Sequence, residues 1–305
     1  MYHLASIFPW VRRFDRIPIT RDQIMLLFVA VNEFFLGLEH YFAHLVTGSL
    51  VPHELIPIIF GPVACVLVII FGIISLRYKT IASILVTIIL AVGIFVGILG
   101  WYYHLIRTII PSGPVEIHKF PQFIYLFVWA PPILGPLTSS LVGLLGIIAV
   151  WSEDPVDSGG FRLSAKYVFP FPISKTRIFF LLTALGILAT LMSSVFDHAR
   201  TDFENPWLWV PVVIGTFGVA VTVYLGFIER PIRADLVTFF IAMILLIAVG
   251  VTGSILHILM DLTSRNEIVA ERFIKGAPFL APLLFTDMGM LGIIVLLDPN
   301  EKLTK

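Results

Sequence analysis

Histidines near the ends of long apolar segments are the residues in this sequence whose type and spacing could do chemistry. Four of them, His44, His104, His198 and His257, fall at similar heights on segments that run in the same direction. Two neutral imidazoles on separate helices can hold a haem iron from both sides. We therefore predict two haem-binding pairs, His44 with His104 and His198 with His257.

Glycines precede two of these histidines at helical spacing. Gly97 and Gly100 lie seven and four residues before His104, on one helix face. The same spacing recurs in Gly250, Gly253 and His257. A strip without side chains would let a flat haem approach the helix, but glycines at this spacing also let helices pack closely. Both interpretations, cofactor binding and helix packing, are open.

Glu39, His40 and His44 form a second candidate group. His40 and His44 are one helical turn apart and could chelate a single copper, zinc or non-haem iron ion, with Glu39 beside them. The competing interpretation is that an imidazole is simply tolerated at the level of the lipid headgroups. That interpretation suits His53 and His118 equally well.

Two carboxylates fall in the middle of apolar segments. Glu33 lies in the first segment, and Asp287 lies at a similar depth in the last. Ionisable groups inside a membrane are costly and are functional by default, so proton transfer, or proton acceptance from a quinol, is one hypothesis. The other is a protonated carboxyl bonded to a neighbouring helix through Asn32 or Thr286.

Composition places these groups in a membrane protein. Hydrophobic residues make up 58% of the 305 residues and charged residues 13%, whereas a soluble domain carries roughly 25% charged residues. Too little charge is present to cover a water-facing surface, so lipid must solvate most of the chain. The net charge of zero gives no reason to expect a nucleic-acid partner.

Continuous apolar segments predict eight transmembrane helices. A helix needs about 20 apolar residues to cross the hydrocarbon core. The segments that meet this need are 23–47, 53–76, 80–110, 121–151, 175–199, 206–229, 234–263 and 276–297. Prolines in the fourth and eighth segments should bend those helices.

The two halves of the chain carry the same pattern. The stretch 44–61 matches 198–215 without a gap, and 142–148 matches 288–294. Each half has four predicted spans, so both halves insert with the same orientation. We predict an all-α integral membrane fold of two tandem parallel four-helix repeats. The predicted parts are an amphipathic arm (1–22), the first repeat (23–152), a linker (153–174), the second repeat (175–298) and a tail (299–305).

Arginine and lysine predict the orientation. The side of the N-terminus holds Arg12, Arg13, Arg16, Arg21, Arg77, Lys79, Arg162, Lys166, Lys175, Arg177, Arg230, Arg233, Lys302 and Lys305. The opposite side holds fewer, namely Arg107, Lys119, Arg200, Arg265, Arg272 and Lys275. The positive-inside rule then puts the arm, the linker, the tail and both termini in the cytoplasm, and the paired histidines at the outer face of a plasma membrane.

This layout resembles the membrane subunits that bind b-type haem in a four-helix bundle with ligands on alternate helices, as in cytochrome b. The resemblance pairs His44 with His104 and His198 with His257. Cytochrome b has a second, inner set of ligands, whereas the inner half of this sequence has none. A haem would therefore sit only near the outer face, where it could meet a quinone or an extracytoplasmic redox partner.

Four functions are compatible with these patterns. The first is a membrane subunit of a respiratory-type electron-transfer complex that holds haem b. The second is a metal-dependent membrane enzyme or a metal-handling protein with copper, zinc or non-haem iron. The third is a proton-coupled transporter, and the fourth is a cofactor-free structural subunit. All four imply contact with a lipid bilayer, and the first and last also imply other subunits.

Overall fold

The computed structural model describes residues 2–14, 19–45, 50–109, 127–128, 132–163, 167–263, 271–272 and 276–297, without the side chains of 12–14. His118, the tail 299–305 and most of the first part of the predicted span 121–151 lie outside the described residues. The same holds for Arg16, Lys119, Lys166, Arg265 and Lys275.

Long apolar segments form the helices of the structure, because in lipid every backbone polar group must bond within its own segment. The long helices are α2 (Arg21–Leu45), α3 (Leu55–Ile74), α4 (Lys79–Ile109), α7 (Lys175–Ala199), α8 (Trp209–Phe227) with the preceding turn η2 (Pro206–Leu208), and α9 (Arg233–Thr263). These six are long and apolar enough to cross a membrane. Within the described part of the chain, the protein is therefore a helical membrane protein with six candidate spans.

Two shorter helices correspond to the predicted fourth and eighth spans. These are α6 (Leu137–Val150) and α11 (Leu283–Val295), with 14 and 13 residues. At 1.5 Å per residue each is about 20 Å long, less than the hydrocarbon core of about 30 Å. Pro136 and Pro282 immediately precede them. Because proline lacks an N–H and restricts the residue before it, these prolines stand before the regular helices instead of bending them.

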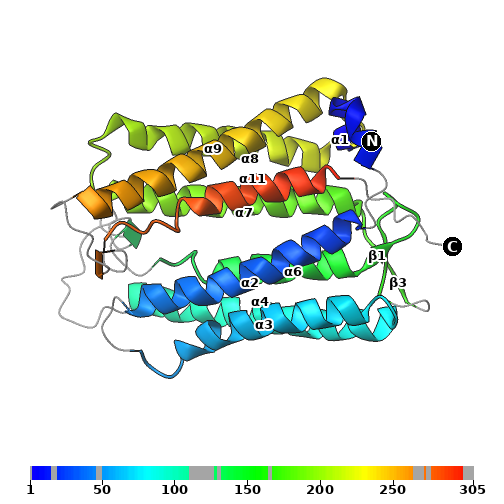
Figure 1. Cartoon of the computed structure of the whole chain (residues 1–305), viewed down its shortest axis with the longest axis horizontal. Coiled ribbons are helices and arrows are strands. Elements are labelled where there is room, and N and C mark those ends of the chain that lie inside the picture. Colours follow the sequence, from blue (N-terminus) through cyan, green and yellow to red (C-terminus); the bar gives the residue numbers. More distant parts are fainter. Residues whose placement is uncertain are drawn as a thin grey trace.

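The helices lie side by side with a central group of four (Figure 1). α2, α6, α7 and α11 contact one another in this centre, while α3 and α4 flank it on one side and α8 and α9 on the other. In the first half, α2 and α4 each contact both α3 and α6. α2 and α4 therefore occupy diagonal corners of a four-helix bundle, and side chains from their inner faces can meet in its centre.

Glycines bring α4 against α6 and α9 against α11. A methyl group on Gly97 would lie 2.7 Å from both the carbonyl oxygen of Pro136 and the backbone nitrogen of Ser140. A methyl group on Gly250 would lie 2.7 Å from the carbonyl oxygen of Pro282 and 2.6 Å from the nitrogen of Thr286. Such distances are too short for any side chain, so both helix pairs depend on glycine for their separation.

Both ends of the predicted linker and the N-terminal arm are packed at one end of the bundle. Strands β1 (Ser152–Glu153), β2 (Gly160–Arg162) and β3 (Val168–Pro170) form an antiparallel sheet between α6 and α7. The arm contains α1 (Leu4–Ile7) and η1 (Pro9–Phe14). The Tyr2 hydroxyl donates to the carbonyl of Ile228, and the Leu4 N–H donates to that of Leu296 at 2.7 Å. Burial raises the pKa of the Tyr2 hydroxyl, which keeps it a donor.

Buried cations join the two halves at this same end. Lys175 and Arg21 are only 1% and 2% exposed. The Lys175 ammonium donates to Asp22 at 2.5 Å and to the carbonyl of Trp151 at 2.6 Å. Arg21 donates to the Thr176 hydroxyl at 2.8 Å. Each half thus offers a cation from its first helix to a side chain of the other half, and every such charge has a partner, as burial requires.

Replacing Gly97 with alanine should destabilise the protein by about 1–3 kcal/mol, because the added methyl group overlaps the backbone of α6. Gly72 is the matched control, since it also lies in a long apolar helix but has nothing within 4 Å of its added methyl group. Thermal unfolding in detergent should show a lower midpoint for Gly97→Ala and not for Gly72→Ala. Equal midpoints would show that the α4–α6 contact does not limit stability.

Candidate functional site

Histidines from the diagonal helices α2 and α4 meet at the end of the bundle away from the sheet. His40 and His44 lie on the last turns of α2, and His104 lies near the end of α4. The two helices run in the same direction because α3 returns the chain between them (Figure 1). The predicted convergence of His44 and His104 is therefore present in the structure.

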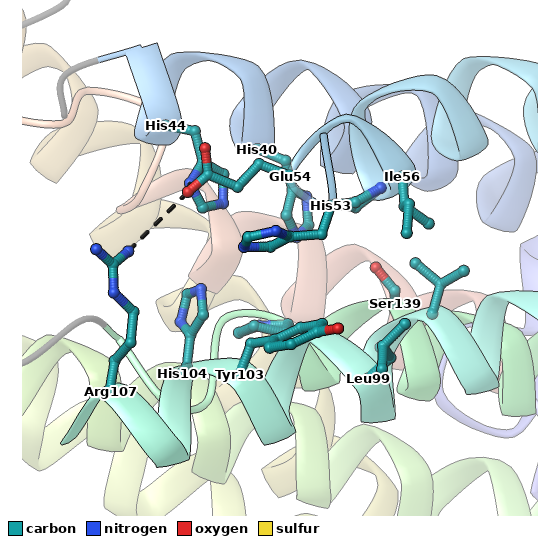
Figure 2. A pocket seen from close by; sticks show the side chains of 15 residues that line it. His40, His44, His53, Glu54, Ile56, Leu99, Tyr103, His104, Arg107 and Ser139 are labelled. Atoms are coloured by element: carbon teal, nitrogen blue, oxygen red, sulfur yellow. Dashed lines mark ion pairs between the residues drawn. The ribbon is translucent and has the colours of Figure 1, made fainter. Parts of the chain in front are cut away.

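The rings of His44 and His104 point toward one another from opposite helices (Figure 2). Their centroids are 6.0 Å apart, and the ring planes make an angle of 77°. Two imidazoles on opposite sides of one metal ion, each with a metal–nitrogen distance of about 2.0–2.1 Å, have ring centres about 6 Å apart. The spacing is thus compatible with one metal ion between the two rings.

Backbone carbonyls accept hydrogen bonds from two of these histidines, His104 and His40. The Nδ1 of His104 lies 2.9 Å from the carbonyl oxygen of Pro132, and the Nδ1 of His40 bonds to the carbonyl of Leu36. A carbonyl only accepts, so Nδ1 carries the proton in both rings and Nε2 keeps a lone pair. Histidines that bind metals usually donate their second N–H to a carbonyl or carboxylate in this way.

Glu54 is a residue of this site that the sequence analysis missed. It lies just before the first turn of α3 and is 7% exposed. Its Oε1 is 3.3 Å from the Nδ1 of His44 and 4.0 Å from Arg107, while its Oε2 accepts the Val51 N–H at 3.1 Å. The available signal was a carboxylate directly after His53, in the connection that follows the helix of His40 and His44.

A small pocket lies beside the facing rings (Figure 2). His53 covers it from the α2–α3 connection, with its ring 4.9 Å from that of Tyr103 on α4. The cavity volume is about 50 Å³. Sites for small organic ligands usually enclose about 300–1,000 Å³. The pocket as it stands therefore has room for an ion and water but not for a porphyrin.

The predicted group of Glu39, His40 and His44 is only partly assembled. His40 and His44 both line the pocket, whereas Glu39 is not among its lining residues. Over the residues that the structure describes, no three His, Cys, Asp or Glu side chains are placed to hold a metal ion together. Any ion here would have to rely on two imidazoles, with water in its other positions.

Gly97 and Gly100 border the pocket, but a neighbouring helix already fills the space beside them. A methyl group on Gly100 would lie 2.8 Å from the Cβ of Pro136, and Gly97 faces the start of α6. In the second half, Gly250 and Gly253 face Pro282 and Thr286 in the same way. These glycines thus serve helix packing in the structure, and their predicted contact with haem stays a prediction.

The second half repeats part of this geometry. The Nδ1 of His257 lies 3.1 Å from the carbonyl oxygen of Pro278, as that of His104 does from Pro132. His198 bonds to the Ser194 hydroxyl at 3.3 Å, and its ring centroid lies 6.3 Å from that of Phe203. His198 and His257, both described, interact electrostatically but have no ring contact. The close imidazole pair is therefore a feature of the first half.

The two buried carboxylates differ in their hydrogen bonding. Asp287 accepts a hydrogen bond from the Asn32 amide at 3.1 Å, so it joins α11 to α2 as the packing hypothesis expected. Glu33 is 1% exposed, and its Oε1 has no hydrogen-bond partner in the structure. In the other half, Leu141 matches Asp287 and Gly186 matches Asn32, and these two residues also lie against each other.

A scan against protein-family models, a search of curated proteins and a search of solved structures each found no match to this chain.

Replacing Asn32 with glycine should destabilise the protein, because Asp287 loses its buried donor at a cost of about 1–3 kcal/mol. The double variant Asn32→Gly with Asp287→Leu reproduces the Gly186–Leu141 pair and should recover most of the lost stability. Thermal unfolding in detergent measures both. A double variant that is less stable than Asn32→Gly alone would contradict the interpretation of this contact as packing.

Proposed function

We propose that this chain is a membrane protein that binds a transition-metal ion between His44 and His104. The observation that carries the proposal is the pair of imidazoles that face each other 6.0 Å apart from diagonal helices. Imidazole nitrogen suits copper, zinc and iron. His40, one turn from His44, and His53 also line the pocket and are the further imidazoles that could approach the ion.

The pocket volume favours an ion over haem. A cavity of about 50 Å³ accommodates a metal ion with water, and the glycine strip that could admit a porphyrin faces α6. The function that follows is metal handling or metal-dependent chemistry at the outer face.

Electron transfer through haem b is the second candidate. Two opposed imidazoles, each held through Nδ1, are the ligand set that this cofactor uses. This candidate requires α6 to move away from α4 so that a porphyrin can enter. It would make the protein a respiratory-type subunit that exchanges electrons with a quinone or an extracytoplasmic partner.

A duplicated membrane fold underlies this site in our proposal. We infer eight spans, with α6 and α11 extended by the proline-containing segments before them, as two parallel four-helix units. The matching contacts of Gly97 and Gly250 support this fold. So do the reciprocal bonds of Arg21 to Thr176 and of Lys175 to Asp22, which link equivalent positions of the two halves.

The orientation follows from the positive-inside rule. Arg21, Lys175, Arg177 and Arg233 all lie at the end with the sheet and the N-terminal arm. We infer that this end faces the cytoplasm of a plasma membrane and that the metal pocket faces outward.

His104→Ala should remove the bound metal, whereas His257→Ala should not. The two residues occupy matching positions with matching carbonyl contacts, but only His104 has a second imidazole opposite it. Elemental analysis and an absorption spectrum of the purified protein measure the effect. A reduced-minus-oxidised haem spectrum in the wild type would select the second candidate, and wild-type protein with neither metal nor haem would overturn both.

Glu54→Gln should weaken metal binding by about 10–100-fold, because the carboxylate orients His44 and raises the basicity of its ring. Glu229→Gln is the control, since Glu229 is an exposed carboxylate that pairs with Arg177 at the other end of the bundle. Competition with a chelator of known affinity gives the dissociation constants. Equal affinities in the two variants would exclude a role for Glu54 in the site.

A further inference from the structure

Glu33 is a buried carboxyl that no contact in the described structure accounts for. It lies near the middle of α2 and is 1% exposed. Its side chain reaches the contact with α3 and α4, where a methyl group on Gly93 would lie 3.4 Å from the Glu33 Oε1 and 3.2 Å from the Phe60 ring. A polar group is thus enclosed by apolar surface at the depth of the hydrocarbon core.

The lack of a hydrogen-bond partner distinguishes Glu33 from Asp287. Oε1 of Glu33 is buried without a partner, whereas Asp287 accepts the amide of Asn32. An ionised carboxylate in such a place is costly unless it is paired. Glu33 therefore holds a proton while no cation is bound in the nearby pocket. For packing alone, a neutral residue of equal size would serve as well.

Glu33 lies between the histidine pocket and the end of the bundle that carries the sheet. It precedes His40 by seven residues and His44 by eleven on the same helix, which is about 10 and 16 Å along the axis. On α4, its neighbour Gly93 lies one turn below Gly97, which lines the pocket. Between these groups the bundle is apolar, so a charge in the pocket is poorly screened from Glu33.

Few other ionisable groups face Glu33. Cys65 of α3 interacts with it electrostatically, and α4 presents Gly93. Helix α6 has no ionisable side chain, and on α11 the carboxyl of Asp287 is bonded to Asn32. Glu39 and His40 are the nearest ionisable residues further along α2. A cation in the pocket would thus act on Glu33 without a fixed positive charge beside it.

We propose that Glu33 is a proton-binding site that releases its proton when a divalent metal ion occupies the pocket. This inference rests on the metal site proposed above. The step involves no electron transfer: the ion enters, the Glu33 carboxyl loses one proton to water, and the resulting carboxylate offsets part of the added charge. When the ion leaves, Glu33 takes up a proton again. Metal binding at this site is therefore pH-dependent beyond the titration of the histidines themselves.

Calorimetric titration of Zn²⁺ into metal-free protein tests the proposal. Measurements at one pH in two buffers with different ionisation enthalpies give the number of protons released per ion bound. Wild-type protein and Asp287→Asn should release the same number, and Glu33→Gln should release about one proton fewer, because only Glu33 titrates with the ion. Equal proton release in wild type and Glu33→Gln overturns the inference and leaves the metal site intact.

Two further measurements separate the remaining outcomes. If wild-type protein gives no heat of Zn²⁺ binding, the metal site itself is wrong and this inference falls with it. If Glu33→Gln does not fold, infrared difference spectroscopy of wild-type protein replaces it. Zn²⁺ should then cause the loss of a protonated carboxyl band and the gain of a carboxylate band, and an unchanged carboxyl band overturns the inference.

Discussion

The close approach of α4 to the start of α6 determines the geometry on which the candidate site depends. Gly97 and Gly100 leave no side chain between the helices, so the turn at Pro136 rests on the α4 backbone. That contact places the carbonyl of Pro132 beside His104, where it accepts the Nδ1 proton. The ring is thereby held with Nε2 directed toward the bundle centre, where His44 approaches from the diagonal helix. A packing requirement of the membrane, that apolar helices associate through small residues, thus also positions a chemical group.

The second half shows what this packing alone produces. His257 has the same carbonyl contact, formed by the same arrangement of glycine and proline, yet the structure gives it no imidazole in ring contact. The difference lies in the helices opposite. The position that matches Glu54 is Leu208, and the position that matches His40 is Ser194, which bonds to His198. Without a carboxylate at the start of α8, His198 lies beside Phe203 instead. Helix packing supplies one imidazole in each half, but a carboxylate at the start of the following helix is present only in the first. In the second half, the carboxylate that interacts with His198 and His257 is Asp197, on α7 itself.

The sequence predicted the helices well where an apolar segment has no internal proline: α7 spans 175–199 as expected. It placed the starts of the fourth and eighth helices too early, because hydropathy counts proline-containing turns as part of a helix. In the structure, α6 and α11 begin only after Pro136 and Pro282. The pairing of His44 with His104 was predictable from equal heights on helices of the same direction. For the glycines the sequence left both cofactor binding and helix packing open, because the residues that they contact lie about thirty to forty residues further along the chain. Glu54 was missed for a related reason, since a carboxylate at a helix start gives no periodic signal.

Buried polar groups have hydrogen-bond partners to different degrees at the sheet end, in the middle and at the histidine end of the bundle. This difference is a better guide to a functional residue than residue type alone. At the end with the sheet, Lys175 is fully buried yet donates to a carboxylate and two carbonyls, so its charge is already used in joining the halves. At mid-depth, Asp287 has a donor while Glu33 lacks one. At the other end, the Nδ1 atoms of His44 and His104 lie beside the Glu54 carboxylate and the Pro132 carbonyl, and both residues line the pocket. A buried group without a partner is unfavourable in the folded state. Arg162 and Asp261 also have a buried atom without a partner, so the lack of a partner alone does not mark a site. Glu33 differs from them in its position on α2, about two to three turns before the histidines that line the pocket.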